Sequence, residues 1–197
     1  MKDYKFGAIP SPLGPRDYAM PSGAGEKDFP KEYSSISKIK NFKVLNQLQY
    51  NSCVANAIVM AMAIKYAMEH NWELPDLEAI LRSIYMCYLN REPQDYQGEG
   101  MIPREAFKNV QKFGLCLKSE FHKPMEVPEG YAEFNKVKTK LLELAKNNKI
   151  GNYYHIPIYE SPRFPNSPLG LLDATAIKKA VMKNGSAVVC FYVFDNI

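Results

Sequence analysis

The stretch QLQYNSCVANA, residues 47–57, joins a polar loop directly to an apolar segment, with a cysteine at the junction. From Cys53 to Ile64 the sequence contains no charged residue, and apolar side chains fall on every side of a helix of that length. A helix that is apolar all round has to be buried. Asn51 and Ser52 are of the types that favour the capping positions just before a helix. The sequence therefore predicts a buried central helix over residues 52–70, with Cys53 in its first turn.

The first turn of a helix is a chemically special place for a cysteine. Free backbone N–H groups and the positive end of the helix dipole converge there. Such surroundings favour the thiolate, which is the reactive form of cysteine, and the N–H groups can bind an oxyanion. Gln47, six positions upstream on the loop, is placed to offer a side-chain N–H to the same oxyanion. Two interpretations stay open at this point: Cys53 is a nucleophile, or it is a small core residue, as free cysteines often are.

The spacing of these residues resembles that of the papain family of cysteine peptidases, in which the Cys of a Ser-Cys pair stands six residues after a Gln, at the start of the central helix. The resemblance implies that Cys53 is the nucleophile and that Gln47 is the oxyanion-hole glutamine. Two positions depart from the family pattern. Val54 stands where the family has an aromatic residue, and Tyr50 stands where it has a cysteine, so the disulfide made by that cysteine is absent. The string CVANA is more similar to bacterial and viral branches than to plant or lysosomal enzymes.

Composition narrows the function classes. The chain has 197 residues, a net charge of +4, 46% hydrophobic and 23% charged residues, which is ordinary globular composition. The basic residues are scattered, which argues against nucleic-acid binding. No apolar segment follows the N-terminus as in a signal peptide, and no stretch approaches the ~20 residues that span a bilayer. We therefore expect no membrane partner and a cytoplasmic or virion-associated protein, with the oligomeric state left open.

The cysteines and glycines give no sign of a cofactor. Cys53, Cys87, Cys116 and Cys190 include no CxxC pair, which argues against a structural zinc site. If Cys53 is a free nucleophile, three cysteines remain, and an odd number argues against a complete disulfide framework and for a reducing compartment. The chain has no glycine-rich phosphate loop. We expect neither a metal nor a cofactor.

The pattern along the chain predicts an α+β fold in three parts. Residues 1–40 are interrupted by proline and glycine and are expected to form an extended arm, and residues 41–148 a helical lobe. Residues 149–197 are expected to begin a β lobe. Further helices are predicted over residues 77–90, 103–113, 131–147 and 173–183, and strands over 150–159 and 187–194. The resemblance implies a papain-like fold, with a long central helix in the helical lobe and an incomplete antiparallel β-barrel after it.

A polar loop over residues 91–100 precedes the predicted helix at 103–113. In the papain family the glycine-containing loop at this place lines the substrate cleft and pairs with the peptide backbone. The resemblance therefore implies a peptide or protein substrate, with Glu99 and Gly100 as binding residues.

The partner residues that a cysteine nucleophile needs do not follow. These are a base, usually His, and an orienting Asn or Asp, which papain-like enzymes carry about 130–150 residues after the Cys. The chain continues for 144 residues (197 − 53), no His follows His155, and the only Trp is Trp72, so the family's Asn-Ser-Trp segment is missing. His70 is expected at the far end of the central helix, ~25 Å from Cys53.

The absence of the expected His and Asn leaves three interpretations of the chain. In the first, the chain is the front part of a papain-like cysteine endopeptidase, inactive alone because the His and Asn are missing. In the second, it is an inactive papain-fold module that binds peptides in its cleft. In the third, the motif is accidental and the chain is an unrelated α+β domain.

Overall fold

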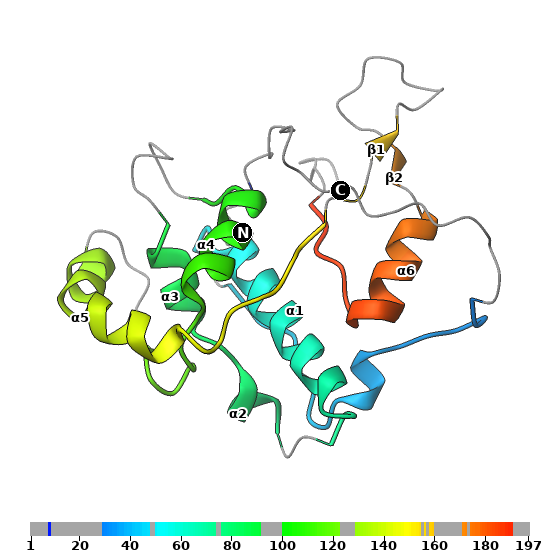
Figure 1. Cartoon of the computed structure of the whole chain (residues 1–197), viewed down its shortest axis with the longest axis horizontal. Helices are drawn as coiled ribbons and strands as arrows, with labels where there is room; N and C mark the ends of the chain where they lie inside the picture. Colours follow the sequence, from blue (N-terminus) through cyan, green and yellow to red (C-terminus); the bar gives the residue numbers. More distant parts are fainter. Residues whose placement is uncertain are drawn as a thin grey trace, which may run out of the picture.

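The computed structural model describes residues 8, 29–47, 50–73, 76–91, 100–122, 129–154, 156, 158–159, 171–172 and 174–190, and every structural statement refers to these. Helix α1, Cys53–Glu69, lies at the centre of the molecule (Figure 1). Helices α3, Ile84–Leu89, and α4, Pro103–Phe113, lie on one side of it, with α5, Glu129–Ala145, farther out. Helix α6, Ala174–Asn184, lies on the other side. A short 3-10 helix η1, Ile36–Lys38, precedes the loop that leads to α1.

Helix α1 is the buried central helix that the sequence predicts, one residue shorter at each end. It packs against α2, Leu77–Ile80, as well as against α3 and α4; half of its apolar side chains are buried and the others are partly buried. The largest fully buried side chains of the core come chiefly from α1, α3 and α5 and from the segments that connect the helices: Tyr88, Phe134, Ile58, Leu81, Met86 and Leu89. No helix in the described ranges is both long and apolar enough to cross a membrane.

The prediction of one helix over residues 77–90 is wrong, because the chain breaks into α2 and α3 around Ser83. The Ser83 hydroxyl accepts a hydrogen bond from the Met86 N–H at 3.0 Å, as an N-cap does, and donates one to the Phe121 carbonyl at 2.8 Å. The Ser83 N–H donates to the Cys116 carbonyl at 2.9 Å, and Arg82 forms an antiparallel bridge with Leu117. Tertiary partners and a capping side chain thus replace the helical hydrogen bonds here.

Helix α4 has the predicted bounds, and Gly114 ends it in a conformation that only glycine adopts readily. Its φ is +77° and its ψ −175°. A Cβ at this position would lie 2.1 Å from the Ala145 carbonyl oxygen at the end of α5. The neighbouring Leu115 N–H donates to the Asn148 carbonyl at 3.1 Å. The ends of α4 and α5 therefore meet backbone to backbone at this glycine.

The predicted helix over 173–183 corresponds to α6, but the strands are shorter than predicted. Strand β1, Ile158–Tyr159, pairs antiparallel with β2, Leu171–Leu172, with Ile158 opposite Leu172. Residues 151–154 have no regular structure, so the predicted strand over 150–159 is largely wrong.

The strand predicted over 187–194 is also corrected as far as residue 190. Residues 186–190 pair with no strand in the described ranges, and Val189 is 45% exposed, so this part is not buried on both faces. An apolar segment becomes a buried strand only when neighbouring strands pair with it. Residues 191–194 lie outside the described residues, and the β-barrel lobe stays a prediction.

The predicted arm is described only from Phe29 onward and at Ala8, which forms a parallel bridge with Met101. The division of the chain at residues 40 and 148 is not tested by these contacts and also stays a prediction.

Candidate active site

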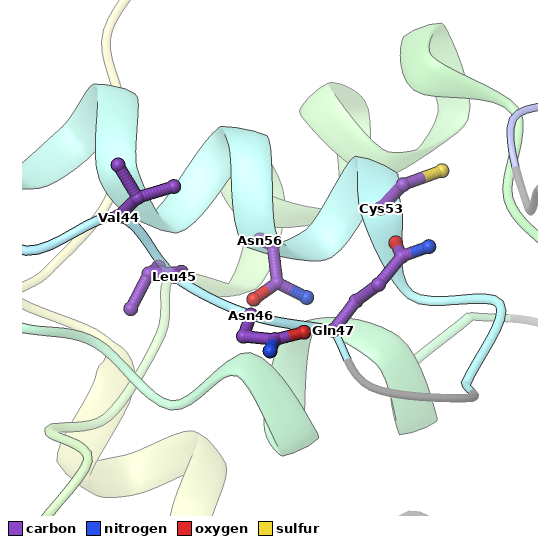
Figure 2. A pocket seen from close by; sticks show the side chains of 6 residues that line it. All are labelled: Val44, Leu45, Asn46, Gln47, Cys53 and Asn56. Atoms are coloured by element: carbon purple, nitrogen blue, oxygen red, sulfur yellow. The ribbon is translucent and has the colours of Figure 1, made fainter. Parts of the chain in front are cut away.

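A cavity of about 490 Å³ lies where the loop before α1 meets the first turn of that helix. Its lining combines two aliphatic side chains, three amides and one thiol: Val44, Leu45, Asn46, Gln47, Asn56 and Cys53. In Figure 2 the amide of Gln47 reaches up from the loop towards the first turn of α1, beside Cys53. The structure therefore brings together the two residues, Cys53 and Gln47, that the sequence assigns to nucleophile and oxyanion hole.

Cys53 is the first residue of α1 and is half-buried, so its thiol is not sealed in the core. The first hydrogen bond of the helix runs from the Asn56 N–H to the Ser52 carbonyl at 2.9 Å. Ser52 stands at the N-cap position, as predicted, but its side chain makes no capping hydrogen bond. No acidic residue lies in the first turn. The N-terminal N–H groups of α1 thus keep their capacity to stabilise negative charge near the thiol.

Asn56 is a site residue that the sequence reasoning missed. It is 8% exposed, and its Nδ2 donates to the Ser52 carbonyl at 2.9 Å and to the Ser52 hydroxyl oxygen at 3.1 Å. Its Oδ1 finds no hydrogen-bond partner among the described residues. The available signal was that Asn56 is the single amide in the apolar run from Cys53 to Ile64.

The other cysteines differ sharply in their surroundings. Burial raises the pKa of Cys87 to about 12. Burial, with the nearby Glu120 carboxylate, raises the pKa of Cys116 to about 12 as well. Both thiols therefore stay protonated and unreactive, as is usual for cysteines in a protein core.

Cys190 comes near Cys53, which the sequence reasoning did not foresee. Gly185 packs on Ile64 of α1, and residues 186–190 continue without regular structure. Five extended residues cover about 17 Å, which matches the rise of α1 from Ile64 back to Cys53. Partial desolvation of its thiol raises the pKa of Cys190, although the residue is exposed, and the Cys53 thiol adds to the rise, so the two lie within electrostatic reach. Both cysteines are free thiols in this structure.

Neither described histidine lines the cavity. His70 ends α1, where its Nδ1 lies 2.9 Å from the Tyr66 carbonyl oxygen and its ring stacks on Tyr66. Its predicted place far from Cys53 is confirmed. His122 is exposed and meets the Tyr85 ring edge-on. His155 lies outside the described residues.

Of the two predicted substrate-binding residues, Glu99 lies outside the described residues and Gly100 is buried. The Gly100 carbonyl accepts a hydrogen bond from Arg91 Nη1 at 2.7 Å. The Arg91 guanidinium lies 3.9 Å from the centre of the Tyr88 ring, and its Nε donates to the Tyr131 hydroxyl at 2.7 Å. Arg91 thus fixes the backbone at Gly100, but Gly100 does not line the cavity beside Cys53.

No group of His, Cys, Asp and Glu side chains in the described part of the chain is arranged to hold a metal ion. The side chains around Cys53 are amides and aliphatics, which suit nucleophilic chemistry with hydrogen-bond stabilisation of an oxyanion.

Comparison with known proteins gives a match at the level of structure. No protein-family model matches the chain, and no curated protein matches it in sequence. The crystal structure of xylellain, a cysteine protease from Xylella fastidiosa, matches with a TM-score of 0.60 and 22% sequence identity. The match covers 91% of this chain and 63% of the xylellain chain, so this chain spans less than two thirds of that protein. The chain therefore has the papain-like fold that its sequence predicts.

Proposed function

We propose that this chain carries the nucleophile of a papain-like cysteine peptidase. The observation that supports the proposal best is the meeting of Cys53 and Gln47 at one cavity, with the thiol in the first turn of a buried helix. This is the arrangement that the sequence resemblance implies, and the fold shared with xylellain supports it independently.

In the proposed reaction, the Cys53 thiolate attacks the carbonyl carbon of a peptide bond. Negative charge then develops on the carbonyl oxygen, where the Cys53 N–H and the Gln47 side-chain N–H stabilise it. The amine leaves with a proton, and water hydrolyses the resulting thioester. The acceptor of the thiol proton is a histidine in the papain family, and neither His70 nor His122 is placed for this role. We therefore expect no peptide hydrolysis that depends on His70 or His122 as the base.

The substrate of the proposed activity is a peptide or protein, without a metal or cofactor. Glu99 and Gly100 belong to this proposal as residues of the substrate cleft. The resemblance alone supports this assignment, since Gly100 is buried and its carbonyl already accepts a hydrogen bond from Arg91. The antiparallel β-barrel lobe and the cytoplasmic or virion-associated location also remain part of the proposal.

Labelling with an epoxysuccinyl peptide probe tests the proposal. The probe is applied to this chain and to the same chain with any C-terminal extension that its gene encodes, and a Cys53→Ala variant of each serves as control. We expect labelling of Cys53 in the form that contains a histidine base, and none in the controls. Failure of every form to react would favour an inactive peptide-binding module. Labelling of Cys87 or Cys116 would contradict the proposal.

A further inference from the structure

The amide of Asn56 is held in one orientation beneath the nucleophile. The atom facing the Ser52 carbonyl at 2.9 Å has to be a nitrogen, because two carbonyl oxygens would repel each other. The same Nδ2 lies 3.1 Å from the Ser52 hydroxyl oxygen. Oδ1 therefore points away from Ser52, and it has no partner among the described residues.

An amide in this position is expected to lower the stability of the folded chain. A buried acceptor without a hydrogen bond lowers stability, and a leucine of similar size would avoid that cost. The neighbouring positions of α1 are apolar and tightly packed, and Ala55, Ile58 and Val59 are fully buried. Unfavourable polar groups that persist in a well-packed core tend to occur at functional sites. Asn56 also lines the cavity that contains Cys53 and Gln47 (Figure 2).

The effect of the amide on Ser52 suggests what that function is. A serine at the N-cap normally accepts a hydrogen bond from an N–H of the first turn. Ser52 does not: its backbone has φ −103° and ψ 20° in place of the extended conformation of a capping residue, and its side chain is completely buried. Its hydroxyl oxygen instead accepts from Asn56 Nδ2. The first-turn N–H groups of α1 are therefore left without a side-chain cap, next to Cys53.

We propose that Asn56 is a positioning residue, which holds the Ser52 hydroxyl away from the helix end and so keeps the first-turn N–H groups available to the reacting Cys53. This inference deepens the proposed function, since uncapped N–H groups stabilise both a thiolate and an oxyanion formed beside them. Asn56 acts through Ser52 and the helix end and does not itself contact the reacting atoms.

The test is a double-mutant cycle on the full chain with four proteins: the natural sequence, Asn56→Leu, Ser52→Ala and the double variant. The rate of Cys53 alkylation by iodoacetamide at neutral pH is measured for each by peptide mass spectrometry. This rate reports thiolate stabilisation whether or not the chain hydrolyses peptides. The melting temperature is measured alongside.

Asn56→Leu is expected to lower the rate roughly threefold, the change that corresponds to the loss of one favourable interaction at a helix end. Ser52→Ala alone is expected to leave the rate unchanged, and the double variant is expected to recover the natural rate, because no hydroxyl remains to cap the helix. The melting temperature of Asn56→Leu should equal or exceed that of the natural chain. A purely structural asparagine would give the opposite result, with a lower melting temperature and no rescue by Ser52→Ala.

Hydrogen exchange of the Val54 and Ala55 amides gives a second readout, and Asn56→Ala replaces Asn56→Leu if the leucine variant does not fold. Exchange should slow when Asn56 is removed and return when Ser52 is removed as well. Unchanged exchange and an unchanged alkylation rate would overturn the inference. If the cycle behaves as expected while no epoxysuccinyl probe ever labels Cys53, the proposed peptidase function fails and the role of Asn56 stands.

Discussion

At the scale of single residues, the four cysteines of the chain have different environments because they lie at different places in the fold. Cys53 is half-buried at a helix start, and Cys190 is exposed and near it. Cys87 and Cys116 are buried. The sequence predicted the position of Cys53 at the start of the central helix, because capping types and an apolar run are local signals. It did not predict the approach of Cys190, which depends on how residues 185–190 pack along α1.

Replacing Gln47 tests its assignment as an oxyanion-hole residue. Gln47→Ala is expected to slow acylation of Cys53 by an activated nitrophenyl ester roughly 100-fold, because one donor to the developing oxyanion is lost. Nitrophenolate release measures the rate. The control is Asn46→Ala, since Asn46 lines the same cavity from the neighbouring position on the loop.

The Gln47 assignment does not survive if both alanine variants slow acylation equally. Such a result would mean that the loop as a whole, and not the Gln47 amide, supports the reaction. A change of less than about threefold in Gln47→Ala would have the same meaning.

At the scale of elements, the sequence predicted best where the signal is local. The bounds of α4 match because Pro103 and Gly114 mark its two ends. Sequence periodicity missed the break between α2 and α3, because the hydrogen bonds that favour it reach Cys116 and Phe121 more than 30 residues away. The prediction of a buried strand over residues 187–190 was wrong for a similar reason. Whether an apolar segment forms a strand depends on distant pairing partners, which its own sequence does not indicate.

The contact between the ends of α4 and α5 yields a prediction about stability. Gly114→Ala is expected to lower the free energy of unfolding by at least about 2 kcal/mol, because the φ of +77° is unfavourable for alanine and its Cβ would overlap the Ala145 carbonyl. Urea unfolding measures the change. Gly151→Ala is the matched control, since a Cβ there meets nothing within 4 Å.

Gly151→Ala is expected to stay within about 0.5 kcal/mol of the natural chain. Equal unfolding free energies for the two alanine variants would show that the backbone contact at Gly114 is not formed as described.

At the scale of the whole molecule, burial of Cys87 and Cys116 in the core around α1 makes the stability of the folded chain depend on pH. A thiol whose pKa rises from 9.0 to about 12 on folding favours the folded state below pH 9. Above that pH the unfolded chain loses a proton that the folded chain keeps, so stability falls as pH rises towards 12. Each such thiol contributes a slope of about 1.4 kcal/mol per pH unit in this range.

We therefore expect the free energy of unfolding to fall between pH 9 and pH 11 more steeply in the natural chain than in a Cys87→Ala/Cys116→Ala variant. Comparing the two slopes removes the contribution of lysines and tyrosines that titrate in both proteins. Parallel slopes would mean that the two thiols are not sealed in the folded core.

The central helix and the papain-like fold were predictable from the sequence, and the fold shared with xylellain agrees with them, whereas the predicted β-barrel lobe stays a prediction. The candidate site was predictable only in part. Cys53 and Gln47 lie close in sequence, whereas Asn56 gains its role from a side-chain hydrogen bond that no periodicity indicates.

The most direct test of the central claim is a crystal structure, after reaction with a peptide aldehyde, of the form of the chain that contains a histidine base. The account predicts a covalent bond from Cys53 Sγ to the aldehyde carbon. It also predicts that the new oxygen lies roughly 2.7–3.1 Å from both the Cys53 backbone nitrogen and Gln47 Nε2. An adduct on another cysteine, or an oxygen at Cys53 that faces away from both donors, would contradict it.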